Sequence, residues 1–267
     1  MNTTAPFSAQ PKDGQTGAVM HSAQRVSPLF LALAGSTVLG GVLATFDGAV
    51  VRTLGIVLIV LGGWATSLCL HEFGHAITAY RGGDREVRAK GYLTLDPRHY
   101  TDPVLSIVLP LLFVAIGGIP LPGGAVWINH SALRSRRVES AVSLAGPSTN
   151  LLLGLLLTTA VATVPMPTGL SAGLSYLAFL QVIAFVLNIL PIPGLDGYGV
   201  IEPWLSGPAR RFGEQARPWA PLVLFMLIIS VPVLGRMFFG LGYFVFDLVG
   251  GDSLQVILGQ SWFRFWE

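Results

Sequence analysis

Residues 53–80 read TLGIVLIVLGGWATSLCLHEFGHAITAY, and this stretch decides the fold class. Its first 18 residues carry no charge, and no proline interrupts the polar residues that follow. A run of this length can cross a bilayer as a helix. We therefore expect one membrane helix whose polar residues lie near one end. Three ionisable side chains beside such an apolar run are costly unless they have a function, so the same stretch indicates a functional site.

The rest of the chain has the composition of a membrane protein. Of its 267 residues, 52% are hydrophobic and 11% are charged, and the mean hydropathy is +0.65. Soluble domains usually carry about 25% charged residues. The net charge of +2, without a basic run, excludes a dedicated nucleic-acid binder. The single cysteine, Cys69, excludes an internal disulfide and a cysteine metal cluster.

Apolar segments and their breaks predict an all-α polytopic membrane protein with about six transmembrane helices. Residues 1–27 are polar with scattered prolines and glycines, which predicts a flexible tail. Residues 28–250 are expected to form the membrane-embedded domain, and the aromatic residues in 251–267 fit an interfacial tail. Prolines and glycines interrupt residues 103–129. We therefore expect a re-entrant or short extended segment there, lining a cavity near the active site.

Three basic stretches predict the orientation of the chain. They hold five, three and three Lys or Arg residues, at 81–98, 134–137 and 210–217. By the positive-inside rule, these stretches face the cytoplasm. We expect a multi-pass protein of the plasma or inner membrane, surrounded by the lipid bilayer, with its active site toward the cytoplasmic side.

The sequence His71-Glu72-Phe73-Gly74-His75 has the H-E-x-x-H form of a metal site on a helix. Four residues turn an α-helix by about 400°, so His71 and His75 share one face and can point at one metal ion. Glu72 lies beside that face, where its carboxylate can take the proton of a metal-bound water. The alternative is a pair of histidines that only form hydrogen bonds. The cost of placing three ionisable groups beside an apolar run favours the metal site.

Asp196 is the best candidate for a third metal ligand. A catalytic zinc ion needs three protein ligands and one open position. Residues 188–197, NILPIPGLDG, end an apolar helix with two prolines and two glycines, so Asp196 lies on irregular backbone. The charge pattern places it on the same side of the membrane as His71 and His75. An isolated Asp-Gly pair more often marks a turn, and only the neighbouring motifs favour a ligand.

The chain resembles the site-2 protease family of intramembrane zinc metalloproteases. It shares the H-E-x-x-H sequence, the N-x-x-P and L-D-G sequences within residues 188–197, and an A-G-P-x-x-N sequence at residues 145–150. The resemblance extends over residues 68–198. Gly146 and Pro147 within the third sequence also fit the start of a helix, because proline is tolerated in a first turn.

The resemblance implies a role for each matching residue. His71, His75 and Asp196 would bind one zinc ion per chain, and Glu72 would be the general base. Asn188 would be a catalytic residue that hydrogen-bonds the substrate or the developing oxyanion.

Two further features have both a functional and a structural interpretation. Asn150 is a candidate for substrate binding, although asparagine in a membrane helix often bonds to a neighbouring helix. Residues 117–126, GGIPLPGGAV, resemble the family's membrane-embedded glycine-rich loop or strand. We expect Gly123 and Gly124 to offer an unpaired edge to extended substrate backbone, because a carbonyl in a substrate helix is inaccessible until the helix unwinds. The alternative is a plain connector.

Together, these features predict a zinc-dependent metalloendopeptidase that hydrolyses peptide bonds in or near transmembrane segments of membrane proteins. One alternative is a non-proteolytic membrane protein of the same fold, a pseudoprotease or a metal carrier. Another is a membrane zinc hydrolase with a non-peptide substrate. A carrier needs ligands along a path, whereas this sequence offers one compact ligand set with a general base, which favours hydrolysis.

Overall fold

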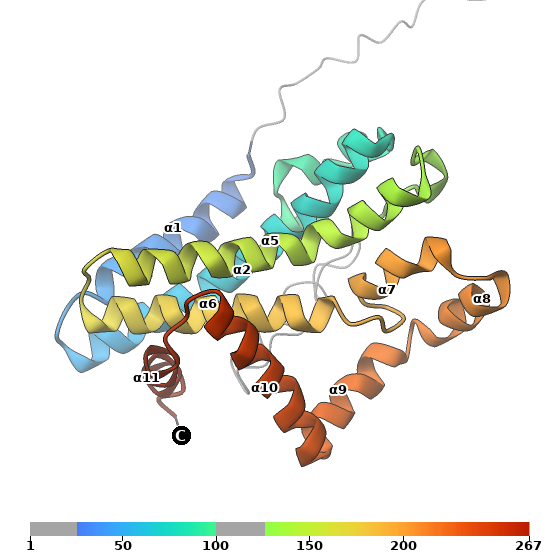
Figure 1. Ribbon diagram of the computed structural model, residues 1–267. Coiled ribbons are helices and arrows are strands. Elements are labelled where there is room, and N and C mark those ends of the chain that lie inside the picture. Colours follow the sequence, from blue (N-terminus) through green and yellow to red (C-terminus); the bar gives the residue numbers. More distant parts are fainter. Residues whose placement is uncertain (1–25, 100–125, 267) are drawn as a thin grey trace, which may run out of the picture.

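Helices make up the regular structure of the residues that the computed structural model describes, 26–99 and 126–266, and no strand occurs among them (Figure 1). Three long helices run side by side: α2 (Ala49–Gly82), α5 (Arg136–Thr163) and α6 (Thr168–Asn188). Each is long and apolar enough to cross a membrane. The described part of the chain thus has the all-α fold of a membrane protein.

The described residues contain three candidate spans, or four if a bent pair is included, whereas six were expected for the whole chain. α9 (Ala220–Ser230) and α10 (Pro232–Leu248) are each too short to cross alone, and they form a fourth candidate span only if the pair, which is bent by 100°, counts as one. Pro232 starts α10 and cannot donate a hydrogen bond to α9, which explains the break. α1 (Pro28–Leu43) is apolar but has only 16 residues. Residues 103–125, where a further crossing was expected, lie outside the described residues.

Small residues allow the helices to approach closely. A Cβ atom at Gly40 would lie 2.7 Å from the carbonyl oxygen of Gly55, so α1 and α2 contact each other backbone to backbone. α11 (Ser253–Phe263) meets α6 in the same way. A Cβ atom at Gly259 would lie 2.8 Å from the carbonyl carbon of Ala172. Because lipid is as apolar as a leucine side chain, such close packing is what holds membrane helices together.

α6 is buried on nearly all sides. In its most apolar stretch of 18 residues, 83% are buried inside the structure. Its residues Tyr176, Leu180 and Ile183 belong to a core shared with α2 and the C-terminal helices. A helix that is apolar all round is normally buried. The hydrogen-bond partners open to a polar residue on α6 are therefore mostly those inside the bundle.

One end of the bundle gathers the loops that carry the functional residues. α2 ends there, α5 begins there, and α7 (Asp196–Ile201) and α8 (Gly207–Ala216) follow the end of α6 (Figure 1). The three basic stretches of the sequence belong to the same end. The side of the membrane that this end faces stays a prediction.

The first and the last described helices are both held to the rest of the structure, in different ways. At the start of α1, the Ser27 N–H donates to the carbonyl oxygen of Thr94 at 2.9 Å, and Ser27 Oγ accepts from the Leu29 N–H. At the other end, residues 251–267, expected as an interfacial tail, contain α11. Val256 and Phe263 of α11 are fully buried, so this helix is packed into the bundle.

Candidate metal centre

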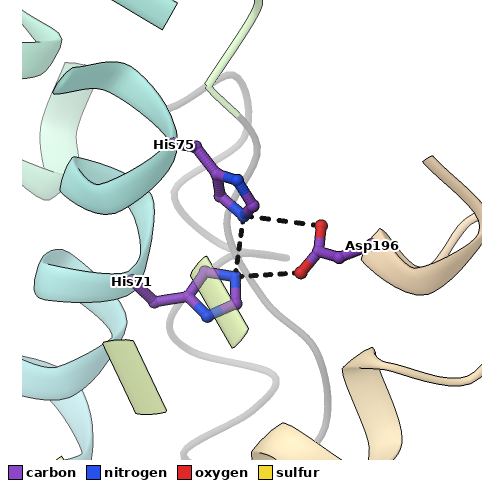
Figure 2. A group of neighbouring side chains, drawn as sticks. All are labelled: His71, His75 and Asp196. Carbon is purple, nitrogen blue, oxygen red and sulfur yellow. Dashed lines mark hydrogen bonds and ion pairs between the residues drawn. The ribbon is translucent and has the colours of Figure 1, made fainter. Parts of the chain in front are cut away.

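The C-terminal half of α2 positions His71 and His75 one turn apart on the same face. Their rings meet edge to face, and their Nε2 atoms lie 3.0 Å apart. Both side chains are buried, together with Glu72. The helical spacing of the H-E-x-x-H sequence therefore brings the two imidazoles together inside the protein (Figure 2).

Asp196 reaches the same point from a different part of the chain. It is the first residue of α7 and follows a turn in which Gly194 has φ +95°, and the second residue of α7, Gly197, packs against the backbone of Ile189. Neither position leaves room for a normal side chain. The Asp196 carboxylate lies with one oxygen 3.2 Å from His71 Nε2 and the other 3.4 Å from His75 Nε2 (Figure 2). One ligand atom from each of these three residues lies within 4.8 Å of the others.

The other ring nitrogens of both histidines are bonded to oxygen acceptors. His71 Nδ1 lies 2.6 Å from Asn150 Oδ1, and His75 Nδ1 lies 2.7 Å from the carbonyl oxygen of Val142. An oxygen acceptor requires a proton on Nδ1, so each neutral ring has its lone pair on Nε2. Two lone pairs that face each other beside the Asp196 carboxylate repel one another unless a proton or a metal ion lies between them. These donors therefore fit a zinc ion, for which two imidazoles and a carboxylate are a known ligand set.

Gly146 of α5 leaves space beside both Nε2 atoms. A Cβ atom at Gly146 would lie 2.5 Å from His71 Nε2 and would also collide with His75 Nε2. The helix backbone thus passes directly beside the metal position and has no side chain there. The interpretation of Gly146 and Pro147 as the start of a helix is wrong, because both lie inside α5. Packing against the histidines, rather than helix initiation, explains the glycine.

Glu72, His75 and Asp196 line one cavity of about 320 Å³. Glu72 Oε2 accepts the backbone N–H of Val126 at 3.1 Å, which orients this carboxylate. Lining the cavity are Glu72, His75, Val126, Ile128, His130, Val142, Ser143, Gly194, Leu195, Asp196, Tyr198, Gly199, Glu202 and Arg217. A proton acceptor and metal ligands therefore face the same space.

Charged groups shape the electrostatics of this cavity. Burial raises the pKa of Asp196, but His75 and His71 outweigh that effect when they are protonated and hold the pKa of this carboxyl well below its usual range. Asp196 is therefore ionised at neutral pH, which is the form that binds metal. Near the wall of the cavity, Arg217 forms an ion pair with Glu202 at 2.9 Å.

The remaining candidate residues have different positions. Asn188 is buried at the last position of α6, on the segment that leads to Asp196. Asn150 is buried on α5 and contacts His71. Neither asparagine is among the described residues that line the cavity. Gly123 and Gly124 lie outside the described residues.

Sequence reasoning missed several groups that hold the ligands. The carbonyl of Val142 has no side-chain signature, so no motif could have identified it. Ser67 and Gln181 are buried and belong to the hydrogen-bonded surroundings of Asn150. Their signal was available, because both are polar residues inside apolar spans, where polar groups bond across helices.

The sequence of the chain is similar to those of several known proteins. The chain is 47% identical over 247 residues to "Putative zinc metalloprotease Rip2" of Mycobacterium tuberculosis, covering 91% of this chain and 95% of that protein. The protein of the same name from Mycolicibacterium smegmatis matches with the same identity and coverage. "Putative zinc metalloprotease YwhC" of Bacillus subtilis is 32% identical over 174 residues, or 61% of this chain and 77% of that protein. No protein-family model and no solved structure matches the chain.

Proposed function

We propose that this chain, which belongs to the site-2 protease family of zinc metalloproteases, is a zinc-dependent endopeptidase that cleaves peptide bonds in or near transmembrane segments of membrane proteins. One observation carries the proposal. Two imidazole Nε2 atoms and the Asp196 carboxylate converge beside Glu72 at the end of an apolar helix. The relatives' names support a zinc metalloprotease, and the three apolar helices support a site within or beside the bilayer.

Each residue of the site has a chemical task in this proposal. His71, His75 and Asp196 would hold the zinc ion. Bound there, zinc would supply Lewis acidity, which polarises a peptide carbonyl and lets water ionise near neutral pH. Glu72 would take a proton from the attacking water and return one to the leaving amine, as a general base and then a general acid. The Val126 N–H bond to Glu72 supports this role, because it holds the carboxylate toward the cavity.

Substrate binding is proposed for the segment that follows the undescribed residues. Val126 and Ile128 line the cavity, and Val126 directly contacts the proposed base. An extended substrate could lie along this wall, with Gly123 and Gly124 continuing its edge. Asn188 would hydrogen-bond the substrate or the oxyanion from the end of α6. The basic residues at the same end of the bundle support an active site toward the cytoplasmic side.

The alternative of a metal carrier has less support. Transport would use ligands spaced along a path through the membrane. Among the described residues, a single group of three His, Cys, Asp or Glu side chains could hold a metal ion. That group lies beside a carboxylate that can act as a base, an arrangement that serves hydrolysis. A pseudoprotease would share this geometry and is distinguished only by an activity measurement.

The decisive experiment compares the wild type with Glu72→Gln. Both proteins are purified in detergent, their bound zinc is quantified, and both are incubated with a panel of single-span reporter substrates. We expect about one zinc per chain in both proteins, because Glu72 is not a ligand, and cleavage by the wild type alone. Loss of a general base typically slows a reaction by roughly 10²- to 10⁴-fold. Folded wild-type protein that binds no zinc would contradict the proposal, whereas zinc binding without any cleavage would support the pseudoprotease.

A further inference from the structure

A continuous chain of hydrogen bonds leads from His71 through the bundle and back to α2. His71 Nδ1 bonds to Asn150 Oδ1 at 2.6 Å, and Asn150 Nδ2 donates to Gln181 Oε1 at 2.8 Å. Gln181 Nε2 then donates to Ser67 Oγ at 2.9 Å, and Ser67 Oγ donates to the carbonyl oxygen of Trp64 at 2.7 Å. The side chains belong to α2, α5 and α6, so the chain joins all three central helices.

Every side chain of this sequence of bonds is buried. His71, Asn150, Gln181 and Ser67 are between 1% and 5% exposed. Water therefore does not compete for these groups, and a buried donor or acceptor that loses its partner costs free energy. The orientation of each group is consequently determined by its neighbours in the chain.

The backbone carbonyl of Trp64 sets the direction of the whole chain. A carbonyl can only accept, so Ser67 must donate to it and then offers a lone pair to Gln181. Gln181 therefore turns its amide N–H toward Ser67 and its oxygen toward Asn150. Asn150 in turn donates to Gln181 and presents its own oxygen to His71. That oxygen requires the proton on Nδ1 and leaves the Nε2 lone pair for a metal ion.

The reverse direction would produce the wrong form of His71. If Gln181 presented its N–H to Asn150, the amide of Asn150 would turn its N–H toward His71. Nδ1 would then accept that bond, and the proton of a neutral ring would move to Nε2, which could no longer bind metal. The same five groups thus have two arrangements, and only one of them leaves His71 able to act as a ligand.

We infer that Gln181, anchored by Ser67, is a positioning residue that selects the metal-binding tautomer of His71 through Asn150. This inference rests on the proposed zinc site and adds residues that lie outside its ligand set. It also gives a function to a polar side chain that is buried on α6. His75 needs no such device, because the carbonyl of Val142 accepts from its Nδ1 directly.

Two substitutions at one position separate this role from a purely structural one. Gln181→Met keeps the length of the side chain but removes the acceptor for Asn150. Gln181→Glu keeps an oxygen toward Asn150, and in its protonated form the carboxylic acid can still donate to Ser67, as the amide of Gln181 does. A merely structural role predicts that Glu is the more harmful substitution, because an ionisable group inside the membrane is expensive. The tautomer role predicts the opposite order for metal binding.

The matched control removes a different hydrogen bond of α6, through its partner on α11. Ser171 Oγ of α6 donates to Gln255 Oε1 of α11 at 3.0 Å. Gln255→Met removes this bond with the same chemical change as Gln181→Met. Ser171 lies ten residues before Gln181, which corresponds to about 15 Å along the helix. Loss of the bond between Ser171 and Gln255 should therefore leave the metal centre unchanged.

The experiment measures zinc affinity by competition with a chelator for the wild type and the three variants in detergent. The visible spectrum of bound Co²⁺ reports the ligand geometry, and thermal unfolding reports the fold. We expect zinc affinity to fall about 10- to 100-fold in Gln181→Met, the usual effect of losing a group that orients a ligand. Gln181→Glu and Gln255→Met should bind zinc as the wild type does, with an unchanged Co²⁺ spectrum.

The possible failures are distinguishable. Wild-type affinity in Gln181→Met, or equal losses in Gln181→Met and Gln181→Glu, would overturn the role of Gln181 and leave the zinc site intact. Loss of zinc binding in Gln255→Met to the same degree would attribute the effect to bundle stability and would also overturn it. Folded wild type that binds neither zinc nor Co²⁺ would overturn the proposed function, and the role of Gln181 with it.

Discussion

α6 is buried on nearly all sides, whereas α9 and α10 expose most of their large apolar side chains. Leu222 on α9 and Met237 and Phe244 on α10 are each more than half exposed. The central helices also carry the polar groups of the metal centre and its hydrogen-bond chain. Helices of similar apolar composition thus have different environments. α6 is surrounded by protein, whereas α9 and α10 are exposed on much of their surface.

The difference teaches where the molecule depends on exact geometry. In the central bundle, helices are in close contact and the polar groups around His71 and His75 have defined partners, so small changes are transmitted to the ligands. In the α9–α10 pair, apolar side chains face outward and the bend at Val231 separates the two halves. We expect substitutions in the pair to be tolerated and substitutions in the bundle to alter metal binding or stability.

The largest effect is expected for Gly146→Ala. The added Cβ would occupy the space beside His71 Nε2 and His75 Nε2. Because α5 is packed against α2 there, the backbone cannot withdraw, and the histidines must separate. We expect zinc affinity to fall by roughly 100-fold or more, the upper end for a disturbed ligand set, and peptide cleavage to be lost. Bound zinc is measured after purification, and helix content by circular dichroism.

Gly240→Ala on α10 is the control for this change. A Cβ atom at Gly240 would have no neighbour within 4 Å, and the residue is exposed. The substitution should leave zinc content and activity unchanged. If Gly146→Ala retained wild-type zinc affinity, the close approach of α5 to the metal position would not matter, and the contrast between the two regions would lose its main support.

A smaller effect, on stability alone, is expected from a pair of leucine substitutions. Leu180 on α6 is fully buried, whereas Leu222 on α9 is 55% exposed. Leu180→Ala leaves a cavity and should lower the free energy of unfolding by about 2 kcal/mol, at the low end of the range for soluble proteins because lipid is itself apolar. Leu222→Ala should change it by less than about 0.5 kcal/mol. Equal losses in reversible denaturation in detergent micelles would show that α9 is also covered by protein.

The sequence predicted the parts of the site that depend on local spacing. The i, i+4 separation of His71 and His75 places them on one face of any helix, and the structure brings them together with Asp196. The turn at Gly194 could also be anticipated from its prolines and glycines. The apolar runs predicted the three central helices, because length and hydropathy alone determine whether a helix can span a membrane.

The parts that depend on tertiary contacts were not predictable in this way. The packing of Gly146 against the histidines requires the distance between α2 and α5, which no spacing rule gives. The carbonyl of Val142 carries no residue-specific signal. The bend at Val231 follows from Pro232, but its angle of 100° depends on how α10 packs against α6. Sequence patterns therefore identify the ligands, while the groups that orient them require the structure.

The smallest effect is expected for an ion pair outside the central bundle, between Asp96 and Arg98. It tests whether a buried polar group there contributes to stability without affecting the metal centre. The Arg98 guanidinium donates to the buried Asp96 carboxylate, with the shortest contact at 2.6 Å, and holds the pKa of Asp96 well below its ordinary value of 3.8. A carboxyl whose pKa is lowered by folding adds stability above its unfolded pKa and loses it as the pH falls further. Unfolding measured between pH 7 and pH 2 should therefore show a loss of stability beginning near pH 4.

Substitution of Asp96 isolates this contribution. Arg98 is 67% exposed, so solvent screens the ion pair, and Asp96→Asn should cost about 1 kcal/mol or less at pH 7. The part of the acid-induced loss that belongs to Asp96 should disappear in the variant, and 1 M salt should weaken it in the wild type. Zinc content should not change, because Asp96 lies outside the ligand set. An Asp96→Asn protein with reduced zinc affinity would instead connect this loop to the metal centre and remove the distinction between centre and periphery.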